Sequence, residues 1–68
     1  MAAEAQSFSL WNAAEQIEES LEREVPALVA RALNYSGPLI GDPAPHWRAL
    51  RDELRRLADL AEQAARHA

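Results

Sequence analysis

The stretch from Trp47 to Ala65 constrains the fold most, because an apolar residue recurs there at every third or fourth position. This spacing lines one face of a helix that turns by about 100° per residue. The opposite face carries charged residues such as Arg48 and Arg55. We therefore predict an amphipathic helix from about residue 46 to 66, whose apolar face must be covered by another element. That face consists of Trp47, Leu50, Leu54, Leu57, Ala61 and Ala64.

A second apolar stripe predicts another helix, from about residue 10 to 34. Ser9 supplies a hydroxyl that can cap the first backbone N–H groups of this helix. The stripe keeps its phase on both sides of Pro26, which favours one helix kinked at this proline. The alternative is a break near Glu24, with Pro26 as the first residue of a new helix. The stripe consists of Leu10, Trp11, Ala14, Ile17, Leu21, Val25, Leu28, Val29, Ala32 and Tyr35.

Residues 35–45 separate the two predicted helices and are expected to form a loop. This stretch holds both glycines and three of the four prolines of the chain. Asp42 followed by Pro43 is typical of a helix cap with proline in the first turn. Leu39 and Ile40 are too apolar for an exposed linker, so we expect them under the end of the two helices or in a contact surface.

The connection predicts that the two helices lie antiparallel, as a helical hairpin in a single domain over residues 9–68. Residues 1–8 have no periodicity and are expected to form a flexible tail. The fold class is therefore all-α.

The distribution of charge supports this pairing of the helices. Residues 1–25 carry six acidic residues and one arginine, whereas residues 46–56 carry four arginines and two acidic residues. Folding the chain back around residue 40 would bring Glu22 and Glu24 close to Arg55 and Arg56. Each exposed pair contributes only about 0–1 kcal/mol, so such pairs choose the orientation of the helices more than they stabilise them.

The size of the chain indicates that the hairpin does not complete its own core. A domain of 68 residues rarely gains more than about 3–5 kcal/mol from its core, and without cysteine it has no disulfide to add. The apolar stripe of the first helix covers an arc of about 120°, which suits a helix with two neighbours. We therefore expect two hairpins to form a homodimeric four-helix bundle, or a partner protein to supply the missing helices.

The residues expected in the core or the interface are the large apolar ones on both stripes and in the loop. They are Trp11, Ile17, Leu21, Leu28, Val29, Leu33, Leu39, Ile40, Trp47, Leu50, Leu54, Leu57 and Leu60.

No group of residues has the spacing of a catalytic or metal site. The glutamates of the first helix, at positions 15, 18, 19, 22 and 24, lack the Glu-x-x-His spacing of di-metal bundles and are expected to face solvent. Asp42 and His46 are four residues apart, but no third ligand has suitable spacing. We expect no enzyme activity, no metal and no cofactor.

The charge of the chain bears on its partners and location. The net charge is −4, which disfavours general binding to nucleic acids or to anionic membranes. No apolar run approaches the roughly 20 residues of a membrane span, and no secretory signal is visible. A soluble, cytoplasmic protein is expected.

Three functions follow from these expectations. The first is a small, non-catalytic protein–protein interaction module or adaptor that acts through its apolar helix faces and self-associates. The first alternative is an accessory subunit or chaperone-like protein that folds onto a larger partner. The second alternative is a nucleic-acid-associated regulator that uses the face with Arg48, Arg51, Arg55 and Arg56, although acidic residues interrupt this face.

Overall fold

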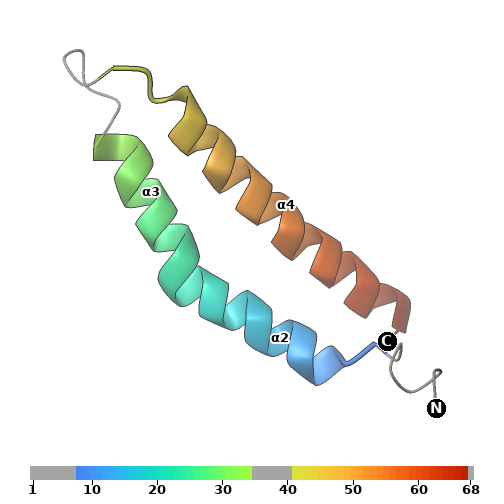
Figure 1. Ribbon diagram of the computed structural model, residues 1–68. Coiled ribbons are helices and arrows are strands. Elements are labelled where there is room, and N and C mark those ends of the chain that lie inside the picture. The colour runs from blue at the N-terminus through green and yellow to red at the C-terminus, as the bar shows by residue number, and fades with distance from the viewer. Residues whose placement is uncertain (1–7, 35–40, 68) are drawn as a thin grey trace.

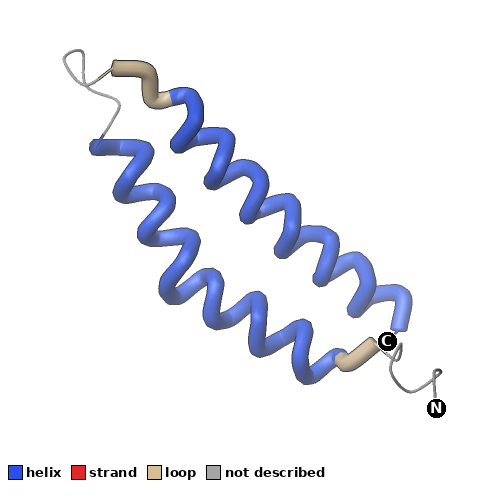
Figure 2. Tube along the Cα trace, in the orientation of Figure 1, coloured by secondary structure: helices blue, strands red, loops and turns tan. Residues whose placement is uncertain are grey.

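The computed structural model of the chain describes residues 8–34 and 41–67. The described residues form helices without strands, which confirms the all-α class. Two long helical segments lie side by side and run in opposite directions (Figures 1 and 2). Within this part of the chain, no helix is long and apolar enough to cross a membrane. The predictions for Leu39, Ile40 and most of the N-terminal tail fall outside the described residues.

The first helical segment runs without a break from Leu10 to Asn34. Its elements are α2 (Leu10–Glu19), η1 (Ser20–Glu24) and α3 (Val25–Asn34). The side-chain oxygen of Ser9 accepts a hydrogen bond of 3.1 Å from the backbone N–H of Asn12. This bond satisfies one of the N–H groups that have no partner inside the helix, so Ser9 is the N-cap that the sequence predicts.

The element η1 is a π-helical turn, which holds more residues than the α-helical turns on either side. The backbone N–H of Val25 donates to the carbonyl of Ser20, five residues earlier. Pro26 follows directly and has no N–H, so the regular hydrogen-bond pattern cannot pass unbroken through this point. Figure 1 shows the segment bending at η1. The bend lies in the turn before Pro26, where the proline ring meets the carbonyl four residues back.

The extra residue in η1 decides which side chains of α3 face the second helix. The inward-facing positions of α2 follow steps of four and three residues, from Ala13 to Ile17 and on to Ser20. Without the extra residue, the same steps would place Glu24 and Arg31 on the inward-facing side. The step of five from Ser20 to Val25 shifts the pattern by one residue, so apolar side chains continue it. The inward-facing residues, all buried or partly buried, are Ala13, Ile17, Ser20, Val25, Leu28 and Ala32.

The second helix, α4 (Ala44–His67), begins two residues before the predicted start. The Asp42 carboxylate accepts a hydrogen bond of 3.0 Å from the backbone N–H of Ala44. The carbonyl of Pro43 accepts hydrogen bonds from two N–H groups of the first turn. A further proline in this turn is tolerated because the first N–H groups of a helix have no partner inside it.

The inward-facing residues of α4 follow alternating steps of four and three, as in the seam of a coiled coil. Apart from Ala44, every described residue of α4 that is not exposed belongs to this series. The series consists of His46, Leu50, Glu53, Leu57, Leu60 and Ala64.

Two side-chain hydrogen bonds define the alignment of the antiparallel helices. Ser20 bonds to Glu53, and Gln16 bonds to Arg56. The midpoint of each pair falls at residue 36 or 37, and not at residue 40 as the sequence analysis expects.

This alignment corrects the predicted charge pairs. The expected ion pairs of Glu22 and Glu24 with Arg55 and Arg56 are not formed among the described residues. The shift of the midpoint displaces α4 by about two helical turns, so Arg56 lies by Gln16. Its ion pair is with Glu53, three residues earlier on its own helix. Glu24 only adds to the negative potential around Arg56.

The core of a single chain is small. Among the described residues, the buried apolar side chains are Ala13, Ala32, Leu50 and Leu57. Two of these are alanines on the first segment, and small side chains at a contact allow helix axes to come closer together. The buried residues of the seam are thus leucines on α4 and small residues on the first segment.

The seam generates a first prediction. Ala32→Leu adds a large side chain where the alanine is completely buried, so it should lower the free energy of unfolding by about 1–3 kcal/mol. The control Ala30→Leu, at an exposed position of the same helix, should change it by no more than about 0.5 kcal/mol. Urea unfolding followed by circular dichroism measures both. Equal effects of the two substitutions would contradict the seam.

Candidate functional site

The hairpin has two unlike faces, and the position of a residue relative to the seam decides which face it belongs to. A helix turns by about 100° per residue, so the residue after an inward-facing one lies to one side of the seam. Antiparallel helices are related by an approximate twofold axis perpendicular to the plane that contains both. This axis exchanges the helices but keeps each face of the pair on its own side. Residues that follow inward positions therefore lie on one face, and residues that precede them lie on the other.

A direct contact supports this assignment. Gln16 precedes the inward-facing Ile17, and Arg56 precedes the inward-facing Leu57. The Arg56 guanidinium donates a hydrogen bond of 3.2 Å to the side-chain oxygen of Gln16. The two preceding positions thus meet across the hairpin on the same face, as the twofold relation requires.

The face formed by the following positions is mainly apolar, although Glu18 and Arg51 also occupy such positions. Leu21 and Leu33 follow Ser20 and Ala32 on the first segment, and α4 contributes large side chains in the same way. Smaller residues fill the positions between them. We call this surface the apolar face, and its main residues are Leu10, Ala14, Leu21, Val29, Leu33, Trp47, Leu54, Ala58, Ala61 and Ala65.

The large side chains of the apolar face are exposed in the hairpin. Leu33 retains 61% of its accessible surface, Leu21 52% and Leu54 45%. Trp47 is 41% exposed. Trp11 lies at the outer edge of the same face and is 77% exposed. Isolated exposed leucines are ordinary, whereas several large apolar side chains on one face of both helices are less common on a single chain.

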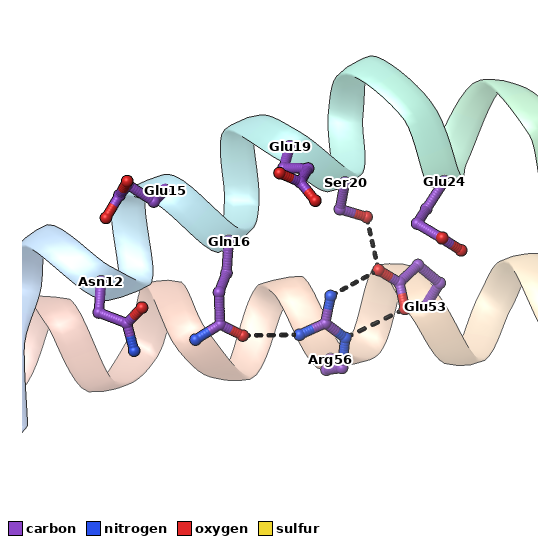
Figure 3. Close-up of a pocket in the computed structure, with 8 residues that line it drawn as sticks. All are labelled: Asn12, Glu15, Gln16, Glu19, Ser20, Glu24, Glu53 and Arg56. Atoms are coloured by element: carbon purple, nitrogen blue, oxygen red, sulfur yellow. Dashed lines mark hydrogen bonds and ion pairs between the residues drawn. The ribbon is translucent and has the colours of Figure 1, made fainter.

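The opposite face is polar and contains an open pocket between the helices (Figure 3). Glutamates and amide side chains from the first segment converge there on a glutamate and an arginine of α4. The lining residues are Asn12, Glu15, Gln16, Glu19, Ser20, Glu24, Glu53 and Arg56.

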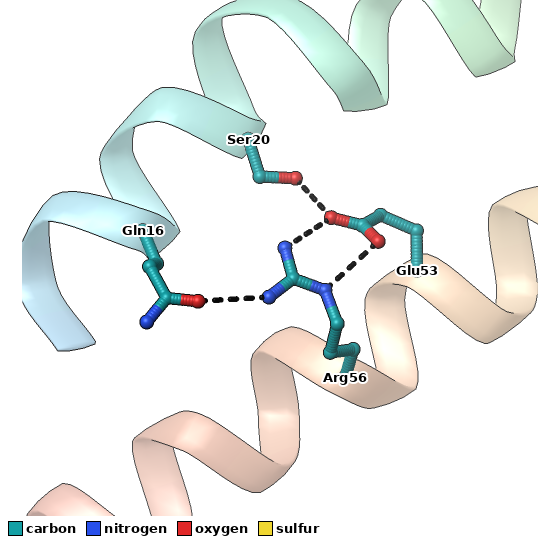
Figure 4. Close-up of polar contacts among 4 residues, drawn as sticks. All are labelled: Gln16, Ser20, Glu53 and Arg56. Carbon is teal, nitrogen blue, oxygen red and sulfur yellow. Dashed lines mark hydrogen bonds and ion pairs between the residues drawn. The ribbon is translucent and has the colours of Figure 1, made fainter.

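A hydrogen-bonded cluster spans the seam at this pocket (Figure 4). The Arg56 guanidinium donates two hydrogen bonds to the Glu53 carboxylate, of 2.7 Å from Nη2 and 3.1 Å from Nε. The Ser20 hydroxyl donates to the same carboxylate from the other helix. Ser20 is buried, and the Glu53 side chain is only 16% exposed. The bond from Ser20 to Glu53 is therefore largely shielded from water, whereas the Arg56 side chain, 46% exposed, lies on the solvent side of the cluster.

The cluster strongly favours the charged form of Glu53. The hydrogen bonds from Arg56, followed by that from Ser20, lower the pKa of Glu53 from 4.5 to about 2, against the opposing effect of burial. The hydrogen bonding to Glu53 in turn raises the pKa of Arg56. These groups hold each other in fixed charge states near neutral pH, which suits a structural contact better than proton transfer.

The arginines expected on one face separate into two groups. Arg56 lies on the polar face, where Glu53 and Gln16 occupy its guanidinium. Arg51 and Arg55 lie on the other side of α4, at the edge of the apolar face, and Arg51 forms an ion pair of 2.9 Å with Asp52. The four arginines therefore do not form one continuous basic surface.

The carboxylates form no metal site in the described part of the chain. No group of three or more histidine, cysteine, aspartate or glutamate residues could hold a metal ion there. The Asp42 carboxylate caps α4 by accepting a hydrogen bond from the backbone N–H of Ala44. The glutamates of the first segment are exposed.

The predicted core and interface residues fall into three groups. Leu50 and Leu57 are buried in the seam, and the partly buried ones are Ile17, Leu28, Val29 and Leu60. The exposed ones are Trp11, Leu21, Leu33, Trp47 and Leu54. This last group lies outside the core of one chain, so its role in an interface stays a prediction.

The sequence analysis missed the small and polar residues of the seam. Ala13, Ser20 and Ala32 are the most buried residues of the first segment, and Glu53 occupies an inward position of α4. The alternating steps of four and three through Glu53 are a signal that could have identified it. Phe8, the last residue of the predicted tail, stacks on His67 with ring centroids 4.8 Å apart.

Comparisons of the chain with models of known protein families, with curated proteins and with solved structures find no match. The function must therefore be inferred from the two faces themselves.

The cluster generates a prediction about pH. Because the folded-state pKa of Glu53 is lowered, its contribution to stability is complete above about pH 4.5 and is lost as the pH falls toward 2. Glu53→Gln should lower the free energy of unfolding by about 1 kcal/mol at pH 7 and flatten its decline between pH 4.5 and 2.

Urea unfolding at a fixed protein concentration, over this range of pH, measures the effect. Glu62→Gln is the matched control, because the Glu62–Arg66 ion pair on the same helix is exposed. We expect the control to keep the decline seen in the unsubstituted protein. An unchanged decline in Glu53→Gln would show that the cluster does not control the acid sensitivity.

Proposed function

We propose that the protein is a small, non-catalytic interaction module whose apolar face binds a second copy, forming a four-helix bundle. The observation that carries this proposal is the set of exposed large apolar side chains that both helices place on one face of the hairpin. In a bundle, the two apolar faces bury one another, and the polar faces remain outside.

The width of the apolar surface supports a two-layered assembly. The seam between the helices uses one line of inward-facing residues from each helix. Beside this line, Leu21 and Leu33 on the first segment and Trp47 and Leu54 on α4 extend the apolar surface in one direction only. A second layer of two helices on this side gives each helix two neighbours, which is the arrangement that a broad apolar arc favours.

The polar face is then the surface available to other molecules. Its pocket is lined by glutamates and amides, and its arginine is already bonded to Glu53. An adaptor that presents such a surface would recognise a protein partner through hydrogen bonds and charge. This role agrees with the acidic balance of the chain.

Leu54→Asp tests the proposal, because Leu54 lies on the apolar face and outside the seam. Burying a charge in the interface should reduce the dimer affinity by at least about a hundredfold. Ala49→Asp is the matched control, since it introduces the same charge at an exposed position of α4 on the polar face. Multi-angle light scattering gives the mass, and circular dichroism on the same samples gives the helicity.

The proposal predicts a dimer for the unsubstituted chain and for Ala49→Asp, and a monomer for Leu54→Asp over the same concentrations. A dimer that survives in Leu54→Asp would show that the apolar face is not the contact surface. A monomer in all three cases would refute self-association through the apolar face and leave the accessory-subunit alternative.

A further inference from the structure

We infer that the second copy sits with its first helical segment over α4 of the first copy, so that acidic and basic edges of the two apolar faces meet. This inference rests on the proposed self-association and specifies how the two copies are oriented. The charges at the edges of the face, and their positions along the helices, carry it.

Around Ser20 and Glu53, the outer side of the apolar face is acidic on the first segment and basic on α4. Glu18 and Arg51 follow the inward-facing residues Ile17 and Leu50 by one residue. Glu22 and Arg55 lie one turn further along each helix, two residues after Ser20 and Glu53, and so point further from the seam. All four charged side chains are exposed. In one hairpin they lie on opposite outer edges, so the acidic pair and the basic pair cannot reach each other.

The two edges carry their charges at matching levels along the bundle. The contacts Ser20–Glu53 and Gln16–Arg56 align the helices. Glu18 lies between Gln16 and Ser20, and so at the level of Arg55. Glu22 lies beyond Ser20, at the level of Arg51, because the helices are antiparallel.

Two symmetric arrangements can bury the apolar faces against each other. With the twofold axis parallel to the helices, the first segment of one copy lies over α4 of the other, and each residue keeps its level. Glu18 and Glu22 then meet Arg55 and Arg51 of the second copy, and symmetry repeats both pairs. All neighbouring helices in this bundle are antiparallel.

The other arrangement has its twofold axis perpendicular to the helices and stacks like helices over each other. The acidic edge then faces the acidic edge of the second copy near the middle of the bundle, and the arginines face arginines. Like charges placed together across an interface disfavour that arrangement, whereas opposite charges fix the orientation of a complex. The charge pattern therefore selects the first arrangement, with the C-terminal ends of α3 from both copies at the same end of the bundle.

A cycle of charge reversals tests the orientation. The basic edge is reversed by Arg51→Glu with Arg55→Glu, and the acidic edge by Glu18→Arg with Glu22→Arg. A third variant carries all four substitutions. Sedimentation equilibrium at low ionic strength gives the dimer Kd of each variant and of the unsubstituted chain.

In the proposed orientation, each half-reversed variant places like charges together, so its Kd should rise by at least about tenfold. The fully reversed variant restores opposite charges, so its Kd should return to within about threefold of the original. Stacked like helices would carry like charges in all four proteins, and similar Kd values throughout would overturn the orientation. A monomeric unsubstituted chain would instead refute the self-association on which the orientation rests.

Cysteine pairs give a second test that does not depend on the charge variants folding, because the chain has no cysteine of its own. A thiol-specific cross-linker that spans neighbouring helices, whose axes lie about 10 Å apart, should yield a covalent dimer of Glu18→Cys with Arg55→Cys, linked between positions 18 and 55. Glu18→Cys with Glu22→Cys should yield little covalent dimer, since these edges lie apart in the proposed bundle. The reverse result, with cross-linking only in the second pair, would show that like helices are stacked.

Discussion

Two helices in contact bury one line of side chains from each, and the apolar residues of this chain extend beyond that line on one side. The rest of the structure depends on this mismatch. The seam buries Leu50 and Leu57 of α4 and the small residues Ala13, Ser20 and Ala32 of the first segment, while other leucines and both tryptophans stay exposed. A core of this size contributes little stability, so the hairpin gains most from covering its apolar face.

The polar cluster and the apolar face have complementary roles in this account. Glu53 occupies a position of the seam that an apolar residue could fill, and it bonds to Ser20 across the helices and to Arg56 beside it. A buried polar contact of this kind fixes the alignment of two helices at a cost in stability, as polar residues do in coiled coils. We therefore assign alignment of the hairpin to the cluster and assembly to the apolar face.

The fold class could be predicted from the sequence because both stripes are long and follow the period of a helix. The cap at Ser9 could also be predicted, since a hydroxyl stands directly before the first apolar residues. The division of each apolar stripe into a buried seam and an exposed face could not be predicted from the sequence. The two surfaces are adjacent on each helix and contain the same residue types, so only the alignment of the helices separates Leu50 from Leu54.

The alignment itself escaped prediction for two physical reasons. The π turn before Pro26 inserts a residue into the inward-facing series, and an extra residue of this kind leaves little trace in hydrophobic periodicity. The contacts that set the level of the helices are polar, between Ser20 and Glu53 and between Gln16 and Arg56. Apolar periodicity gives no information about such polar contacts. The predicted level of α4 relative to the first segment was therefore wrong, and so were the ion pairs that depended on it.

The measurement that tests the central claim most directly is sedimentation equilibrium of the unsubstituted chain over a wide range of concentration, with helicity measured on the same samples. The account predicts a reversible dimer and a helicity that rises as the dimer forms, because the hairpin is completed by a second copy. A monomer whose helicity is high and independent of concentration would contradict it, since a single hairpin would then be stable with its apolar face exposed to water.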